Sequence, residues 1–161
     1  FDGRLDNRQE LLQALDRDDT AGRNLSDAEL ILVAYRQWAE AGIARLLGPF
    51  ALALYDVAHR RVICARDGVG DRSLFYFLSS KLLIVASEEQ AVLAHPAVSR
   101  RLDETHVAVY FSLQEPGDGA TFFADVLRQG DAFFTELERR DAQPHAAQSR
   151  LANGAASMTI T

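Results

Sequence analysis

The sequence predicts an α+β domain in which helices cover a mainly antiparallel sheet. Two observations carry this prediction. Apolar segments over 50–55, 62–65, 74–78 and 82–86 are joined in pairs by short polar turns, as in β-hairpins. Other segments begin with the side chains that favour a helix N-terminus. The 161 residues, 48% of them hydrophobic, are enough for one domain with a substantial core.

The first part of the chain predicts a short opening strand followed by two helices. Asn7 begins the pattern Asn-Arg-Gln-Glu, which indicates a capping box ahead of the apolar residues Leu11 and Leu12. Ser26 begins a second such pattern, Ser-Asp-Ala-Glu. The apolar residues that follow it recur at helical spacing, and they predict a helix over 26–41.

The middle of the chain predicts the two hairpins. Residues 50–55 are apolar at every position, as expected of a strand that is covered on both faces. This strand pairs with 62–65 through a polar turn, and 74–78 pairs with 82–86 through Ser-Ser-Lys. The sheet is therefore expected to be largely antiparallel.

The last part of the chain predicts two more helices and a tail. One helix begins at Ser87 and stops at the His95-Pro96 pair, and another covers 103–111. From residue 128 onward a charged run gives way to small, polar and weakly patterned residues. We expect residues 128–161 to be poorly ordered.

Composition and charge exclude several classes of partner. The formal net charge is -6, from 17 basic and 23 acidic side chains, so the chain offers no basic field to nucleic acid or to an anionic membrane surface. No apolar run approaches the roughly 20 residues of a membrane-spanning helix. A single cysteine fits the cytoplasm. The chain starts without methionine, and we expect a processed chain, an isolated domain or the internal part of a longer reading frame.

Taken singly, the short motifs do not indicate a specific reaction or ligand. The Gly68-Val69-Gly70 segment lacks the third glycine of a dinucleotide site, and no phosphate-binding loop or serine-hydrolase elbow occurs. Cys64 lies among apolar residues of a predicted strand, where packing explains it better than reactivity. The four histidines share no spacing with a carboxylate or with the cysteine, so no metal site is expected.

Read in order, however, six segments carry a family resemblance. They are FDGRLDNR over 1–8, SDAEL over 26–30, RLLGPFALALYD over 45–56, ARDGVG over 65–70, LFY over 74–76 and ASEE over 86–89. In this order and spacing they resemble the class II glutamine amidotransferase domain of glutamine-hydrolysing asparagine synthetases. The resemblance extends to about Leu127.

This resemblance implies an N-terminal-nucleophile fold with αββα layers, of which the chain would hold the later part. It implies a partial amidotransferase domain over 1–96 and, over 97–127, a connection toward a missing synthetase domain. In this family an N-terminal cysteine thiolate attacks the side-chain amide of glutamine, and ammonia passes to an ATP-activated carboxylate such as aspartate. ATP and Mg²⁺ are expected in the synthetase domain alone, with no cofactor in this chain.

The resemblance also implies three glutamine-binding residues. Asp2 and Gly3 occupy the place of an Asn-Gly pair in most glutaminases, where Gly3 would offer its backbone N–H to the oxyanion. Asp2 departs from that pair, since an ionised carboxylate repels an oxyanion. Asp27 matches the carboxylate that holds the α-amino group of glutamine, although Asp27 also suits the first turn of a helix. The nucleophilic cysteine has no counterpart in the chain, so no catalytic residue is assigned.

Two functional hypotheses follow. The first is a partial amidotransferase domain of an asparagine-synthetase-like protein, with glutamine as substrate, an ATP-dependent synthetase domain as partner and no activity of the chain alone. The second is a non-catalytic scaffold that docks onto a synthetase or cyclase domain of the lactam-forming or peptide-cyclising type. In both, uncovered sheet edges could lead the chain to form homo-oligomers.

Overall fold

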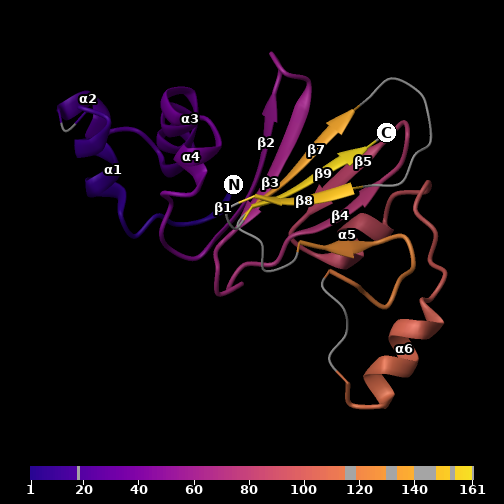
Figure 1. The fold of residues 1–161 in the computed structure, drawn as a ribbon. Helices are drawn as coiled ribbons and strands as arrows, with labels where there is room; N and C mark the ends of the chain where they lie inside the picture. The colour runs from indigo at the N-terminus through magenta and orange to yellow at the C-terminus, as the bar shows by residue number, and fades with distance from the viewer. Residues whose placement is uncertain (18, 115–118, 130–133, 140–147, 153–154, 161) are drawn as a thin grey trace.

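The computed structural model describes residues 1–17, 19–114, 119–129, 134–139, 148–152 and 155–160 (Figure 1). The elements in chain order are β1 (Asp2–Gly3), α1 (Arg8–Ala14), α2 (Thr20–Arg23), α3 (Asp27–Trp38), α4 (Glu40–Ile43), β2 (Phe50–Asp56), β3 (Arg61–Arg66), β4 (Phe75–Leu78), β5 (Leu83–Ala86), α5 (Glu89–Leu93), α6 (Glu104–Phe111), β6 (Leu127–Arg128), β7 (Phe134–Arg139), β8 (Gln148–Ala152) and β9 (Ala155–Ile160).

The strands form two sheets. The larger sheet has the order β1-β2-β3-β7-β9-β8, and the smaller sheet has the order β5-β4-β6. The paired strands run antiparallel, except that β7 and β9 are parallel. Both expected hairpins are present, as β2 with β3 and β4 with β5. The predicted combination of helices with a mainly antiparallel sheet is therefore confirmed.

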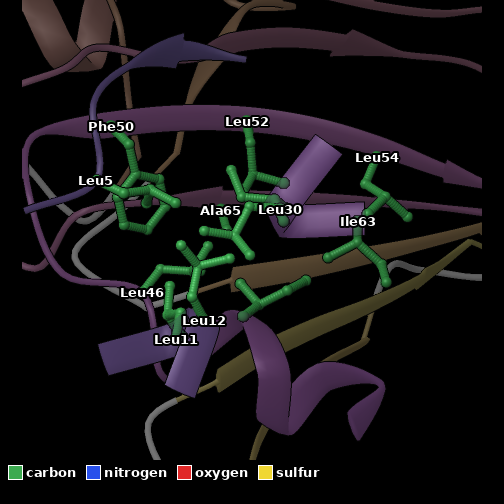
Figure 2. Packing of buried hydrophobic residues seen from close by; sticks show 12 residues of the cluster. Leu5, Leu11, Leu12, Leu30, Leu46, Phe50, Leu52, Leu54, Ile63 and Ala65 are labelled. Carbon is green, nitrogen blue, oxygen red and sulfur yellow. The ribbon is translucent and has the colours of Figure 1, made fainter. Parts of the chain in front are cut away.

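The largest core lies between the β2–β3 hairpin and the helices α1, α3 and α4 (Figure 2). Because side chains alternate along a strand, every second residue of β2 points to the helices. These residues are Phe50, Leu52 and Leu54, and they pack with Leu30 of α3. Figure 1 shows helices α1 to α4 beside the β1–β2 edge of the larger sheet.

The opposite face of the hairpin packs on the second sheet. Ala51 of β2 and Cys64 of β3 are buried together with Leu74, and Leu78 and Leu83 of the β4–β5 hairpin pack against them. The other face of β4 and β5 meets α5 in a third cluster, through residues such as Phe75, Phe77 and Ile84. The order of layers is therefore helix, sheet, sheet, helix.

The coverage of β2 on two faces is less complete than the sequence predicts. Ala53 and Tyr55 also lie on the face opposite the helices, but both are exposed, and Tyr55 is 61% exposed. The second sheet thus covers the beginning of β2 and leaves its later half open on this face.

The predicted helix over 26–41 ends earlier, at Trp38. Ala39 has a φ of +50° and separates α3 from α4. The turn brings Gly42 so close to α3 that a Cβ there would lie 2.5 Å from the carbonyl oxygen of Ala34. Apolar spacing alone predicts one continuous helix, because it carries no information on this close packing of α4 against α3.

Two of the predicted helix caps are wrong. Asn7 precedes α1, but its side chain caps nothing: it donates to the carbonyl of Arg45 and accepts from the N–H of Leu47, at 2.8 and 3.0 Å. Asn7 therefore holds the segment that leads into β2. Ser87 lies one residue before Glu88, which is the N-cap of α5. In contrast, the capping box of Ser26 is present and begins α3.

The chain after residue 128 pairs with the larger sheet in the described ranges. β7 runs antiparallel to β3, β9 lies parallel to β7, and β8 pairs with β9. The sequence carries no clear strand pattern over β7, β8 and β9. Strands of this kind depend on pairing with a partner strand that is distant in sequence more than on local propensity. The division of the chain at residues 96 and 127 stays a prediction.

The core gives a first prediction. Leu30 is fully buried, whereas Leu32 of the same helix is 45% exposed. Replacing Leu30 by alanine should lower the free energy of unfolding by about 2–5 kcal/mol, because it leaves a cavity in the helix–sheet core. Leu32→Ala should change it by less than about 0.5 kcal/mol. Guanidinium denaturation of both variants measures the difference, and equal losses would contradict the assigned core.

Candidate functional site

The first two expected site residues lie in β1. Asp2 pairs with Ala51, and Gly3 pairs with Phe50 at the start of β2. Gly3 has a φ of +129°, and a Cβ there would lie 2.2 Å from the carbonyl oxygen of Pro49. The fold therefore requires glycine at this position. Asp2 is exposed, so its carboxylate is open to solvent and to a ligand.

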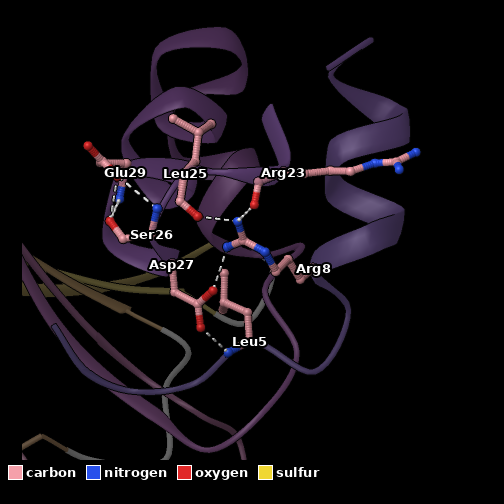
Figure 3. Close-up of polar contacts among 7 residues, drawn as sticks. All are labelled: Leu5, Arg8, Arg23, Leu25, Ser26, Asp27 and Glu29. Carbon is pink, nitrogen blue, oxygen red and sulfur yellow. Dashed lines mark hydrogen bonds and ion pairs between the residues drawn. The ribbon is translucent and has the colours of Figure 1, made fainter. Parts of the chain in front are cut away.

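The third expected residue, Asp27, is the first residue of α3, and its carboxylate points back toward the chain that follows β1 (Figure 3). One carboxylate oxygen accepts a hydrogen bond from the N–H of Leu5 at 2.9 Å. The other forms an ion pair with Arg8, at 2.7 Å from a guanidinium nitrogen. Asp27 therefore joins the start of α3 to the segment between β1 and α1.

Capping of α3 does not need the Asp27 side chain. The Ser26 N–H donates to the Glu29 carboxylate at 2.7 Å, and the Glu29 N–H donates to the Ser26 hydroxyl at 3.3 Å. These reciprocal bonds form the complete capping box. The bond from the Ser26 N–H, followed by the one that the Ser26 hydroxyl donates to the same carboxylate, lowers the pKa of Glu29. Asp27 nevertheless lies in the first turn of α3, where an acidic side chain is favoured, so this alternative role is confirmed.

The structure brings Asp27 close to the segment that follows β1, the strand that holds Asp2 and Gly3. Leu5 follows Gly3 by two residues, and its backbone N–H contacts Asp27 directly. A carboxylate has about four lone-pair sites, so the two bonds to Leu5 and Arg8 leave acceptor capacity on Asp27. The Asp27 side chain is 24% exposed.

Asp67, from the ARDGVG segment of the family resemblance, organises the backbone of the loop after β3, in keeping with a structural interpretation of this loop. Asp67 is buried, and its carboxylate accepts hydrogen bonds of 2.6–3.3 Å. The donors are the backbone N–H groups of Phe50, Val69, Gly70, Asp71 and Arg72. Burial raises the pKa of Asp67, but the hydrogen bonds outweigh it, and the net pKa is lowered. Asp67 therefore ties the loop to the start of β2.

A second polar cluster closes the turn end of the β2–β3 hairpin. Asp56 accepts from the Tyr35 hydroxyl at 2.5 Å and contacts the His59 ring at 2.7 Å. Arg61 donates to the same hydroxyl and pairs with Glu40. The bond from Tyr35, followed by those from His59, holds the pKa of Asp56 well below its usual range. The cluster fastens α3 and α4 to the hairpin, and no local sequence signal indicates it.

The thiol of Cys64 is buried between the two sheets, as expected from its apolar neighbours. Burial raises its pKa to about 12. A thiol attacks an amide as its thiolate, so Cys64 is unsuited to serve as a nucleophile at neutral pH. It is the single cysteine of the sequence.

Within the described ranges, no group of three or more His, Cys, Asp or Glu side chains is placed to hold a metal ion. No helix among the described residues is long and apolar enough to cross a membrane.

Comparison with known proteins decides the family. Residues 1–146 match the model of a family described as a glutamine amidotransferase domain. The chain belongs to this family. The match continues past Leu127, where the motifs recognised in the sequence end. The expected resemblance to the amidotransferase domain of asparagine synthetases is thereby confirmed.

Curated relatives of this amidotransferase domain are much longer proteins. Asparagine synthetase (glutamine-hydrolyzing) 3 of Bacillus subtilis is 32% identical over 122 residues, which are 74% of this chain and 20% of that protein. Asparagine synthetase (glutamine-hydrolyzing) 1 of the same species is 26% identical over 128 residues, 80% of this chain and 20% of that protein. Amidase chry2 of Gibberella zeae is 36% identical over 69 residues, 43% of this chain and 10% of that protein. The chain thus spans about a fifth of the length of the Bacillus relatives.

The Asp67 loop of this amidotransferase domain gives a prediction on pH. Since the folded pKa of Asp67 is lowered, its contribution to stability is present above the unfolded pKa of about 3.9 and is lost as pH falls through the folded pKa. Asp67→Asn should cost about 1–3 kcal/mol at neutral pH, because the buried backbone donors lose their charged acceptor.

Urea denaturation at a series of pH values measures this effect. The difference between wild type and Asp67→Asn should shrink below about pH 4. The exposed residue Asp71 supplies the matched control, and Asp71→Asn should follow the wild-type curve. A difference that stays constant into acid would argue against the role of the charge.

The buried thiol of this amidotransferase domain gives another prediction. At about pH 8, iodoacetamide should alkylate the native protein far more slowly than the guanidinium-unfolded protein, because Cys64 is buried and its pKa is raised. Mass spectrometry at timed intervals measures both rates. Equal rates in the native and unfolded states would mean that Cys64 is accessible.

Proposed function

We propose that the chain is the part of a glutamine-dependent amidotransferase that binds the amino-acid end of glutamine. In the intact protein, glutamine would be hydrolysed and ammonia passed to an ATP-activated carboxylate such as aspartate. The observation that carries the proposal is the position of the Asp27 carboxylate, which contacts Leu5 beside the glycine of β1. An ammonium group is the natural partner of such a partly exposed carboxylate.

In this proposal Asp2, Gly3 and Asp27 contact glutamine. Asp27 binds the α-ammonium group, and the N–H of Gly3 faces the oxyanion that forms at the attacked amide. The exposed carboxylate of Asp2 opposes that oxyanion, because like charges repel. Loss of one oxyanion donor costs about 2.7–4 kcal/mol in related acyl transfers, and a negative charge in its place would cost more.

The chain alone is proposed to be inactive toward glutamine. Hydrolysis requires a nucleophile, and the single cysteine of the chain, Cys64, is buried with a raised pKa. ATP and Mg²⁺ belong in this proposal to a synthetase domain outside the chain. The helix–sheet–sheet–helix order of layers supports assignment to the N-terminal-nucleophile fold. The lone reduced thiol supports a cytoplasmic location.

The runner-up is a non-catalytic scaffold that docks onto a synthetase or cyclase domain. Two observations favour it. Arg8 and Leu5 already occupy one site on each oxygen of Asp27, so the carboxylate has structural partners without a ligand. Large apolar side chains on and beside α6 are also exposed, with Phe111 at 79% and Leu113 at 95%. A partner domain or a second copy of the chain would bury them.

Glutamine binding separates the two proposals. A retained pocket should raise the melting temperature of the full chain as glutamine is added, since ligand that binds the native state alone stabilises by RT ln(1 + [L]/Kd). The stabilisation is about 2.7 kcal/mol when the ligand is at 100 times its Kd. Glutamate release should stay at the level of a heat-treated control.

Matched variants make this test specific. Asp27→Asn should abolish the melting shift with glutamine, because the amide carries no charge to bind an ammonium group. Asp125→Asn makes the same chemical change at an exposed site, where the ion pair to Arg101 is 4.0 Å long, and should leave the shift intact. A wild-type chain whose melting temperature does not change with glutamine would favour the scaffold proposal.

A further inference from the structure

The guanidinium of Arg8 joins three acceptors at the proposed site (Figure 3). Arg8 is the first residue of α1, and one of its terminal nitrogens donates to Asp27 at 2.7 Å. The other terminal nitrogen donates to the carbonyl of Arg23 at 3.2 Å and to the carbonyl of Leu25. All three acceptors lie within the short segment that leads from α2 into α3. Arg8 therefore fixes this segment and the carboxylate together.

The two oxygens of Asp27 are held from two directions. Arg8 contacts one oxygen, and the backbone N–H of Leu5 contacts the other. One contact comes from the main chain of the β1–α1 link, and the other comes from the side chain of the first residue of α1. A carboxylate held in this way has one defined orientation, and its remaining lone pairs point in set directions. Because Ser26 and Glu29 complete the helix cap, the Arg8–Asp27 pair is not needed for that purpose.

From this geometry we propose that Arg8 is a positioning residue, which orients the Asp27 carboxylate to receive the α-ammonium group of a glutamine ligand. The inference rests on the proposed function, since it assumes that Asp27 binds glutamine. Arg8 acts through Asp27 and does not itself contact the ligand. Arg8 should therefore increase the preference of the chain for a ligand with an ammonium group over the same ligand without one.

The guanidinium is suited to this task by its shape. Its planar fork presents donors in fixed directions, so it reaches a carboxylate and two carbonyl oxygens at once. A lysine ammonium is a compact point charge on a longer flexible stem and would not keep these three directions. The side chains of Arg8 and Asp27 are 27% and 24% exposed, so water screens part of their attraction. Arg8 therefore contributes more by orienting the Asp27 carboxylate than by electrostatic attraction to it.

The test compares two ligands that differ in one group. Glutamine and glutaric acid monoamide share the side-chain amide and the carboxylate, but the monoamide has no α-amino group. Calorimetric titration of the full chain with each ligand gives a preference, defined as the ratio of the two dissociation constants. The proteins are wild type, Arg8→Gln, Arg8→Lys and the control Arg36→Gln. Arg36 is an exposed arginine of α3.

Arg8→Gln should reduce the preference for glutamine by about tenfold, because the carboxylate loses its fixed orientation. Arg36→Gln should keep the wild-type preference. A general loss of structure would weaken both ligands alike and would leave the ratio unchanged. Thermal melts of each variant accompany the titrations. If Arg8→Gln does not fold, Arg8→Lys carries the test, and a reduced preference in that variant supports the inference.

The failures of the two proposals are distinguishable. A wild-type chain that binds glutamine, together with Arg8 variants that keep the full preference, overturns the inference and leaves the proposed function standing. A wild-type chain that binds glutamine no better than the monoamide overturns the role of Asp27, and the inference falls with it.

Discussion

The whole architecture depends on the two different faces of the β2–β3 hairpin. One face carries large side chains, such as Phe50 and Ile63, and these fill the space beneath the helices. The other face is buried through the small residues Ala51 and Cys64, which let the second sheet approach closely. Since a shift of one residue would exchange these faces, the register between β2 and β3 sets both interfaces at once. The buried Asp67, which follows β3, accepts a hydrogen bond from the N–H of Phe50 at the start of β2. Because Phe50 pairs with Gly3, this bond also fixes where β1 can pair.

Contacts between segments that are distant in sequence build the candidate site around Asp27, next to this hairpin. β1 lies at the edge of the larger sheet, and the residues after it run past the start of α3. Arg8 and Leu5 each contact one oxygen of Asp27, so a single carboxylate joins α3 to the start of α1 and to the segment after β1. These contacts hold the segments together with or without a ligand, which is why the amidotransferase and scaffold proposals share the same residues.

Local signals account for the parts of the structure that the sequence predicts well. The hairpins follow from apolar segments with polar turns, and the Ser26 capping box follows from a four-residue pattern. The parts that could not be predicted depend on distant contacts. The break at Ala39 reflects the packing of Gly42 on the backbone of α3. Motif order placed Asp27 in the site, but its bond to Arg8 joins residues 19 apart in the chain and leaves no local pattern.

The close approach of Gly3 to Pro49 has a consequence for how the family's sequences should be interpreted. Because the backbone itself excludes a side chain there, selection for folding alone would retain this glycine after any loss of catalysis. A descendant that served purely as a scaffold would keep it as firmly as an active enzyme. Retention of Gly3 is therefore explained by the fold alone and says nothing about activity, whereas the backbone places no such constraint on the neighbouring exposed residue, Asp2.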